Sequence, residues 1–176
     1  EGSYSSSVFL SAYTTKTAVY VLIVTFAGNS ILIYIGIYMI LYGIVYALLE
    51  NDIRRILSYS IVNQVGFMIV GIGIGTELAI NGTSAHAFSH IIYKGLLLMS
   101  AGSVLYVTGK RKCTDVGGLY KTMPITAACG IIGAFAISAF PFTSGFISKS
   151  MIVESSYIEG LEIIWYFLLI GSAGVF

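Results

Sequence analysis

The sequence contains very little charge. It has nine basic and eight acidic side chains in 176 residues, so charged residues make up 10% of the chain, whereas hydrophobic residues make up 57%. Soluble domains carry about 25% charged residues, and this chain has too few to cover a globule of its length. The composition therefore excludes an ordinary soluble domain and favours an integral membrane protein.

Cysteine and proline are also scarce, with two of each. Two cysteines do not suggest a disulfide framework: Cys113 lies in a basic loop expected to be cytoplasmic and reduced, and Cys129 lies in an apolar segment, where cysteine is a small hydrophobic residue. No basic segment precedes the first apolar run, so no secretory signal peptide is expected. The chain begins with Glu1 and ends at Phe176 inside an apolar run, which indicates a fragment of a longer protein.

Long apolar runs, in contrast, are abundant. A membrane-spanning helix needs about 20 predominantly apolar residues. Strands are not expected, because the runs are too long, lack period-two alternation, and would leave open sheet edges in lipid. The predicted fold is an all-α integral membrane protein, a polytopic helix bundle of about six spans with one broken helix. The expected spans cover residues 8–27, 31–49, 56–74, 85–107, 125–152 and 161–176.

Turn and capping signals separate these spans. Residues 28–30, with the sequence Gly-Asn-Ser, predict a tight turn. Asp52 can cap the third helix, and Thr83 or Ser84 can cap the fourth. Pro124 fits the first turn of the fifth helix, because proline needs no hydrogen-bond partner for its nitrogen there.

The basic residues are distributed unevenly between the loops. The loops over 50–55 and 108–123 contain Arg54, Arg55, Lys110, Arg111, Lys112 and Lys121. The alternate loops, over 28–30, 75–84 and 153–160, contain no lysine or arginine. The positive-inside rule therefore predicts that the N-terminus and the loops 50–55 and 108–123 are cytoplasmic.

The other three basic residues, Lys16, Lys94 and Lys149, interrupt or adjoin the apolar runs. A charged side chain at the bilayer centre costs about 2.5–3.5 kcal/mol on insertion scales, so three would cost on the order of 8–10 kcal/mol. Ionisable residues at this depth usually mark ion or proton pathways. We therefore predict proton transport, although lysines can also extend their side chains to the membrane surface.

The fourth expected span carries a polar stripe. His86, His90 and Lys94 are spaced i, i+4, i+8, which places them on one helix face at steps of about 6 Å. Histidine titrates near neutral pH, and a buried lysine can lose and regain a proton. Alternatives remain open: His86 could face the membrane surface and His90 could be a core histidine. A metal site is disfavoured because cysteine or acidic co-ligands are missing nearby, and bis-histidine haem ligation would need partners on another helix.

The fifth expected span contains a helix break. Pro141 and Gly145 lie inside its apolar run, and both residues interrupt or kink helices. Broken helices at membrane depth often mark ion sites in transporters. Spacing leaves two interpretations of Lys149: it lies one turn into a resumed helix, or the span ends at Phe146 and Lys149 is interfacial.

These residues resemble the antiporter-like membrane subunit family, which includes Mrp-type cation/proton antiporter subunits and the proton-pumping subunits of respiratory complex I. The resemblance is carried by Asn51-Asp52-Ile-Arg-Arg-Ile-Leu-Ser-Tyr-Ser60, followed by Asn63-Gln64-Val-Gly66-Phe-Met, by the stripe from His86 to Lys94, and by Phe140-Pro-x-x-x-Gly145-Phe-x-x-Lys149. It covers nearly the whole chain. The segments Ser11-Ala-Tyr-Thr-Thr-Lys16, Gly71-Ile-Gly-Ile-Gly-Thr-Glu77 and His90-Ile-Ile-Tyr-Lys94 look most like the D-type subunits of Mrp antiporters.

The resemblance implies a fold of about fourteen helices with two inverted five-helix repeats, each with a broken helix. The chain would form the second half, from the eighth helix into the thirteenth. Lys16 matches a lysine of the eighth helix, the stripe from His86 to Lys94 matches the relay of the eleventh, and Lys149 matches the charged residue after the break of the twelfth. The family's first-half glutamate–lysine pair falls outside this chain, and Arg54 stands where many members have lysine.

The leading functional hypothesis is proton translocation through a lysine, histidine and water relay, by a subunit of a monovalent cation (Na⁺)/proton antiporter. The alternatives are a proton-pumping subunit of NADH:quinone oxidoreductase and a structural or lipid- or quinone-binding membrane subunit. The expected partners are other membrane subunits of a hetero-oligomeric complex, protons, Na⁺ and lipid, without nucleic acid. No cofactor or metal is expected in this chain, and the expected location is the bacterial plasma (inner) membrane.

Overall fold

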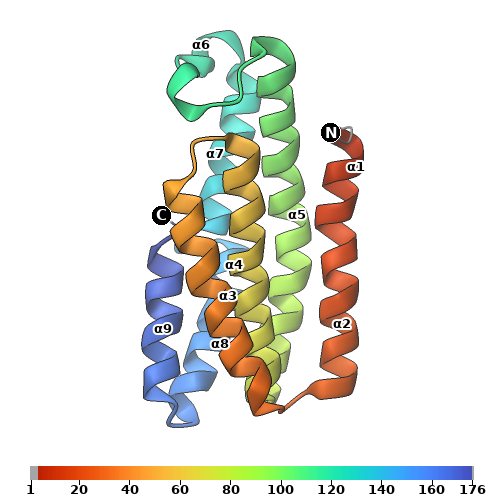
Figure 1. Cartoon of the computed structure of the whole chain (residues 1–176), viewed down its shortest axis with the longest axis vertical. Helices are drawn as coiled ribbons and strands as arrows, with labels where there is room; N and C mark the ends of the chain where they lie inside the picture. Colours follow the sequence, from red (N-terminus) through yellow and green to blue (C-terminus); the bar gives the residue numbers. More distant parts are fainter. Residues whose placement is uncertain (1–3, 176) are drawn as a thin grey trace.

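The computed structural model describes residues 4–175, which fold into a bundle of helices joined by short loops (Figure 1). The helices are α1 (Tyr4–Phe9), the π-helix η1 (Leu10–Thr14), α2 (Thr15–Phe26), α3 (Ser30–Leu49), α4 (Ile53–Ile74), α5 (Glu77–Thr108), the short 3₁₀ helix η2 (Cys113–Asp115), α6 (Leu119–Thr122), α7 (Pro124–Ile137), α8 (Ser144–Ile158) and α9 (Glu162–Ala173). Within the described residues the only β-type pairing is one isolated bridge.

Several helices begin where the sequence signals place them. Asn29 accepts a hydrogen bond from the amide of Ile31 at 3.1 Å and opens α3. Asp52 accepts from the amides of Arg54 and Arg55 at 2.9 and 3.2 Å and caps α4 as predicted. Pro124 opens α7, also as predicted.

The start of α5 differs from the prediction. Thr76 caps this helix by accepting from the amide of Ala79 at 3.3 Å, so the helix begins at Glu77 rather than near residue 85. Thr83 and Ser84, predicted as caps, lie inside the helix. The physical reason is that Gly75 ends α4 in the left-handed conformation (φ 74°), and two residues are then enough for the turn.

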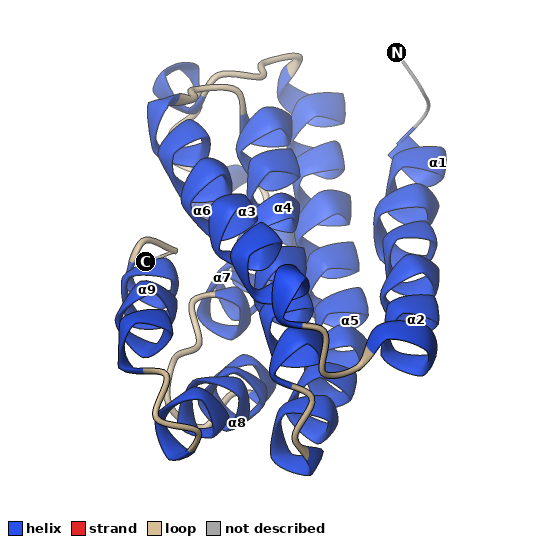
Figure 2. Ribbon diagram, turned by 60° about the horizontal axis from the view of Figure 1, so that its bottom comes forward, coloured by secondary structure: helices blue, strands red, loops and turns tan. Residues whose placement is uncertain are grey.

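The helix is interrupted within residues 125–152, the fifth expected span. α7 ends at Ile137, and the chain resumes as a separate helix, α8, at Ser144 (Figure 2). Pro141 lies in the intervening turn, whereas Gly145 lies inside α8, where a Cβ atom would collide with the carbonyl oxygen of Ala136. Gly145 therefore permits close packing of the two half-helices and does not itself break the helix.

Within residues 4–175, four continuous helical segments are long and apolar enough to cross a membrane. They are Ser6–Phe26, Ser30–Leu49, Ile53–Ile74 and Glu77–Thr108. Pro124–Ile137 and Glu162–Ala173 are shorter apolar helices. The structure therefore has an all-helical membrane architecture, while the expected number of six spans stays a prediction.

The two basic loops meet at one end of the bundle. The amide of Ile53 donates to the carbonyl of Arg111 at 3.1 Å, and the amide of Cys113 donates to the carbonyl of Asn51 at 2.9 Å. At the opposite end the amide of Gly28 donates to the carbonyl of Ile72 at 2.8 Å. The connections α3–α4 and α5–α7 thus lie at the same end of the molecule (Figure 1).

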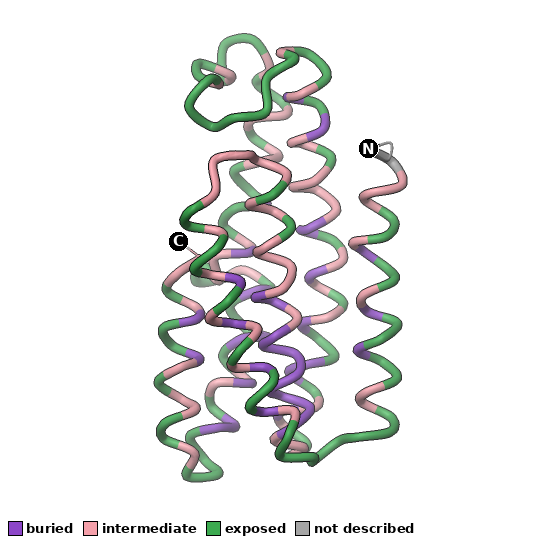
Figure 3. The backbone as a smooth tube through the Cα atoms, in the orientation of Figure 1, coloured by how far each residue is buried: buried purple, intermediate pink, exposed green. Residues whose placement is uncertain are grey.

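The core is centred on α4. Its buried residues include an unbroken stretch from Gly66 to Gly73, and the buried positions gather on the central helices (Figure 3). Phe67 packs with Ile40 of α3, Ile152 of α8 and Leu168 of α9 in one cluster. Helix α5 packs on α4, α7 and α8, so a polar stripe on α5 lies within reach of both halves of the broken helix.

Candidate functional site

All five residues predicted to form a proton relay are buried. Their relative exposures are 7% for Lys16, 0% for His86, His90 and Lys94, and 2% for Lys149. His86 lies nine residues beyond the start of α5 and is buried against other helices. Lys149 lies five residues after the first residue of α8, so it belongs to the helix that resumes after the break.

His86 joins three helices through its ring. Its Nδ1 lies 2.9 Å from the Ser148 hydroxyl oxygen of α8, and its Nε2 lies 3.0 Å from the Gln64 side-chain oxygen of α4. The Gln64 amide nitrogen donates to the Asn63 side-chain oxygen at 3.1 Å. The Asn63 amide nitrogen in turn donates to the carbonyl of Ile40 in α3 at 3.3 Å. His86 therefore stands at the centre of a buried hydrogen-bond chain from α3 to α8.

His90 has a different environment one turn further along α5. Its ring centroid lies 6.2 Å from that of His86 and 5.2 Å from the ring of Tyr93. Neither ring nitrogen of His90, nor the Tyr93 hydroxyl, has a hydrogen-bond partner within residues 4–175. Buried polar groups are normally satisfied by protein or by ordered water, so this pair supplies polar atoms that water can bridge.

Lys94 lies near the middle of α5, and its ammonium donates a hydrogen bond to the Ser60 hydroxyl of α4. The Ser60 hydroxyl donates in turn to the carbonyl of Leu57 at 2.9 Å. That bond uses the single hydroxyl proton and leaves a lone pair of Ser60 directed to the lysine. Ser60 thus acts as a fixed acceptor for Lys94.

Lys149 is held by the helix break. Its Nζ donates to the carbonyl of Ile137, the last residue of α7, at 3.1 Å. The same nitrogen lies 5.1 Å from the centre of the Phe67 ring. A helix C-terminus carries partial negative charge on its free carbonyl groups, so the break supplies an electrostatic partner for the lysine.

Lys16 follows the π-helical segment of the first helix. Its Nζ donates to the carbonyl of Ser11 and to the hydroxyl of Thr15, both at 3.0 Å. Ser11 belongs to the π-helix, and single π-turns occur frequently at functional sites. Thr15 is thus the side chain that accepts from the ammonium of Lys16 within residues 4–175.

The three lysines lie on three helices, α2, α5 and α8. Within the described part of the chain no carboxylate lies at ion-pair distance from any of them, and the one ion pair joins Arg55 to Glu50 at 3.6 Å. No group of three or more metal-ligating side chains comes together in residues 4–175 either. The arrangement offers proton donors and acceptors without a fixed counter-charge.

Sequence reasoning missed the partners of these residues. Gln64, Ser60 and Ser148 contact the relay, but none of them was singled out as a site residue. The same holds for Asn63, which contacts Gln64. Adjacent asparagine and glutamine in an otherwise apolar span are unusual, because an amide in hydrocarbon needs a partner. That signal could have identified the pair on α4.

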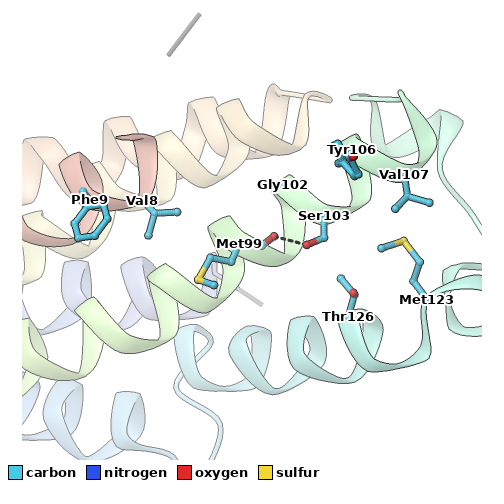
Figure 4. A pocket seen from close by; sticks show the side chains of 9 residues that line it. All are labelled: Val8, Phe9, Met99, Gly102, Ser103, Tyr106, Val107, Met123 and Thr126. Carbon is cyan, nitrogen blue, oxygen red and sulfur yellow. Dashed lines mark hydrogen bonds between the residues drawn. The ribbon is translucent and has the colours of Figure 1, made fainter. Parts of the chain in front are cut away.

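A hollow between α1, α5 and α7 lies away from this network. It measures about 730 Å³ and is lined mostly by apolar side chains of α1, α5 and α7, among them Val8, Met99 and Val107 (Figure 4). Its Ser103 hydroxyl donates to the carbonyl of Met99 at 3.1 Å within α5. The hollow contains none of the five relay residues.

Residues 1–174 match the protein family described as "NADH:quinone oxidoreductase/Mrp antiporter, TM". The chain is 34% identical to the L subunit of F(420)H(2) dehydrogenase from Methanosarcina mazei, an alignment that covers 91% of this chain and 26% of that protein. It is 38% identical to the D-type subunit of the Na(+)/H(+) antiporter from Alkalihalophilus pseudofirmus over 76% of this chain and 27% of that protein.

The fold also has a solved counterpart. A chain of the Mrp complex from Dietzia sp. DQ12-45-1b superposes with a TM-score of 0.91 at 23% identity, over 98% of this chain and 34% of that one. At this identity the likeness shows a common fold. The chain spans about a quarter of the length of the two curated relatives and about a third of the solved chain.

Proposed function

Because the chain belongs to the NADH:quinone oxidoreductase/Mrp antiporter transmembrane family, we propose that it forms part of a membrane subunit that moves protons across the bilayer. Protons pass along Lys16, His86, His90, Lys94 and Lys149, with water between them. The subunit exchanges these protons for a monovalent cation, Na⁺, as the name of the Na(+)/H(+) antiporter relative indicates for that protein.

One observation carries this proposal: three buried lysines on three helices have no acidic partner within residues 4–175. Buried charges in structural roles are normally paired. A lysine that must change its protonation state is better held by neutral acceptors, and the acceptors here are hydroxyl and carbonyl oxygens. A membrane anchor that binds lipid headgroups would instead place its lysines at the membrane surface.

The setting follows from the family and from the charge distribution. The partners are further membrane subunits of a hetero-oligomeric complex, and the location is the plasma membrane of a bacterium. The loops 50–55 and 108–123 face the cytoplasm, since they hold six of the nine basic residues. In this proposal α7 and α8 together form the fifth span and α9 begins the sixth.

The test is proton/Na⁺ exchange in membrane vesicles that contain the intact complex with Lys94→Ala. We expect exchange to fall at least tenfold, because the mid-span proton carrier is removed. Lys110→Ala is the matched control, since Lys110 is an exposed loop lysine, and it should exchange normally. Unimpaired exchange in Lys94→Ala would overturn the assignment of Lys94 to the relay.

A second candidate is a proton-pumping subunit of a redox complex. It is favoured by the 34% identity to a dehydrogenase subunit over 91% of this chain. The same relay would then be driven by electron transfer in partner subunits. A proton gradient that needs a reduced electron donor, and forms without Na⁺, would support this second candidate over the antiporter.

A further inference from the structure

The hydrogen-bond chain around His86 has a fixed direction at one end. The carbonyl of Ile40 can only accept, so the Asn63 atom that lies 3.3 Å from it is the amide nitrogen. The Asn63 oxygen then accepts from the Gln64 amide nitrogen at 3.1 Å. This leaves the Gln64 oxygen facing Nε2 of His86 at 3.0 Å. An oxygen cannot donate there, so Nε2 must carry a hydrogen.

The other ring nitrogen meets a group that can turn. The Ser148 hydroxyl oxygen lies 2.9 Å from Nδ1 of His86 and also 2.9 Å from the carbonyl of Ser144. When Nδ1 carries no proton, the hydroxyl donates to it. When Nδ1 is protonated, its N–H donates to the hydroxyl oxygen, and the hydroxyl proton turns to the carbonyl of Ser144.

From this geometry we infer that Asn63 and Gln64 are positioning residues that hold His86 as its Nε2–H tautomer, so that His86 takes up and releases its proton only at Nδ1, against Ser148. The inference rests on the proposed function for its purpose, but the tautomer itself does not depend on transport. On uptake an O–H bond of a protonated water breaks as one N–H bond forms at Nδ1, so the ring gains the positive charge that the water loses. Release breaks the same N–H bond, returns the proton to water and restores the neutral ring.

Both protonation states are therefore satisfied without moving a heavy atom. In the neutral and in the charged form each ring nitrogen of His86 has one partner, and the four side chains involved are at most 1% exposed. The opposite neutral tautomer would set the Nε2 lone pair against the Gln64 oxygen, which is repulsive. The chain of amides thus decides which of the two nitrogens exchanges the proton.

His90 provides an internal contrast. No partner within residues 4–175 fixes either of its ring nitrogens, so nothing in the described structure selects its tautomer. Proton exchange at His86 is directed to α8, next to Lys149, whereas exchange at His90 has no imposed direction. The structure thus assigns the two histidines of the stripe different parts in one relay.

The experiment is solid-state NMR of the intact complex in lipid bilayers, with ¹⁵N-labelled histidine and with the His86 signals assigned from their loss in His86→Gln. We expect the neutral His86 of the wild type to carry its hydrogen on Nε2, by more than about tenfold over Nδ1. A dominant Nδ1–H form would overturn the inference without any variant.

Variants test the direction of the chain. Asn63→Leu frees Gln64 to turn and should bring the two tautomers of His86 to comparable amounts, whereas Gln64→Glu keeps an acceptor and should keep Nε2–H. An unchanged tautomer in Asn63→Leu would overturn the role of Asn63.

Ser148→Ala removes the partner of Nδ1, so it should leave the tautomer of His86 unchanged while slowing proton exchange at Nδ1. Ser148→Thr keeps a hydroxyl and should restore the rate of that proton exchange. If His86 carries its hydrogen on Nε2 while Lys94→Ala exchanges protons normally, the assignment of Lys94 to the relay is overturned and the inference about His86 stands.

Discussion

At the scale of single residues, the three buried lysines are stabilised by neutral oxygens. Lys94 has the Ser60 hydroxyl, Lys149 the carbonyl of Ile137, and Lys16 the carbonyl of Ser11 and the hydroxyl of Thr15. A carboxylate would hold the ammonium in its charged form more strongly than these groups do. Neutral acceptors therefore keep both protonation states of a lysine accessible.

This balance predicts the effect of removing Ser60. A hydrogen bond to a charged group contributes about 1.5–3 kcal/mol, and each 1.4 kcal/mol corresponds to about a factor of ten. Ser60→Ala should therefore reduce proton translocation in vesicles by roughly ten- to a hundredfold. The matched control is Ser58→Ala on the same helix, because the exposed Ser58 hydroxyl bonds to the carbonyl of Arg54 in its own helix. Equal rates in the two variants would contradict the role of Ser60.

The sequence predicted these lysines better than their partners. Lys16, Lys94 and Lys149 are conspicuous because charge is rare in an apolar chain, and the structure buries all three. Ser60 and Ser148 are ordinary small residues in membrane helices, where a serine often bonds to its own backbone. Which serine faces a lysine or a histidine depends on how α4 and α8 rotate against α5, and one sequence does not contain that information.

At the scale of elements, the pair α3 and α4 depends on glycine for its close approach. A Cβ atom on Gly36 would lie 2.6 Å from Val70 Cγ2 and 2.8 Å from the carbonyl oxygen of Gly66. A Cβ atom on Gly66 would lie 2.9 Å from the carbonyl oxygen of Gly36. Small residues at such crossings are the usual means of helix association in membranes.

The crossing makes a prediction about stability. Gly36→Ala should lower the free energy of unfolding by about 1–3 kcal/mol, because the backbones must separate. Gly95→Ala is the control: a Cβ atom there meets nothing within 4 Å in residues 4–175, and alanine favours a helix by about 0.5–1 kcal/mol over glycine. Denaturant unfolding in detergent measures both. A Gly36→Ala variant as stable as Gly95→Ala would contradict the packing argument.

Element boundaries followed the sequence where a cap was unambiguous. Asp52 and Pro124 are such cases, since one side chain or one ring defines each helix start. The predicted start of α5 near residue 85 was wrong because Glu77, Asn81 and Thr83 lower the local hydropathy, as residues of a loop would. Thr83 is in fact buried within the helix. Low hydropathy indicates that a segment avoids lipid, but it does not distinguish a loop in water from a helix whose polar side chains face other helices.

At the scale of the whole molecule, the backbone bonds between residues 51–53 and 111–113 fix both basic loops at one end. Glu50 belongs to this end, where the backbone amides of Asn51 and Asp52 hold the pKa of its carboxyl below the usual value. The shared end agrees with the alternation expected of helices that cross a membrane. Which side of the membrane it faces rests on the positive-inside rule.

The orientation can be tested with the native Cys113, which is exposed in the loop after α5. In a Cys129→Ser background, a membrane-impermeant maleimide should label Cys113 in inverted vesicles and not in right-side-out ones. Glu159→Cys in a variant lacking Cys113 should show the opposite pattern, because residue 159 is exposed beyond α8, at the other end. Labelling of Cys113 in right-side-out vesicles would show that the basic loops face the outside, opposite to the proposed orientation.

The break between α7 and α8 has a consequence for how the protein can change. The partner of Lys149 is a main-chain carbonyl, and every amino acid at position 137 supplies the same group. No side-chain replacement at that position can delete the lysine's acceptor, unlike a carboxylate, which one nucleotide change can remove. The acceptor depends on the backbone conformation, so it persists under mutation for as long as residues 138–143 keep α7 and α8 separate.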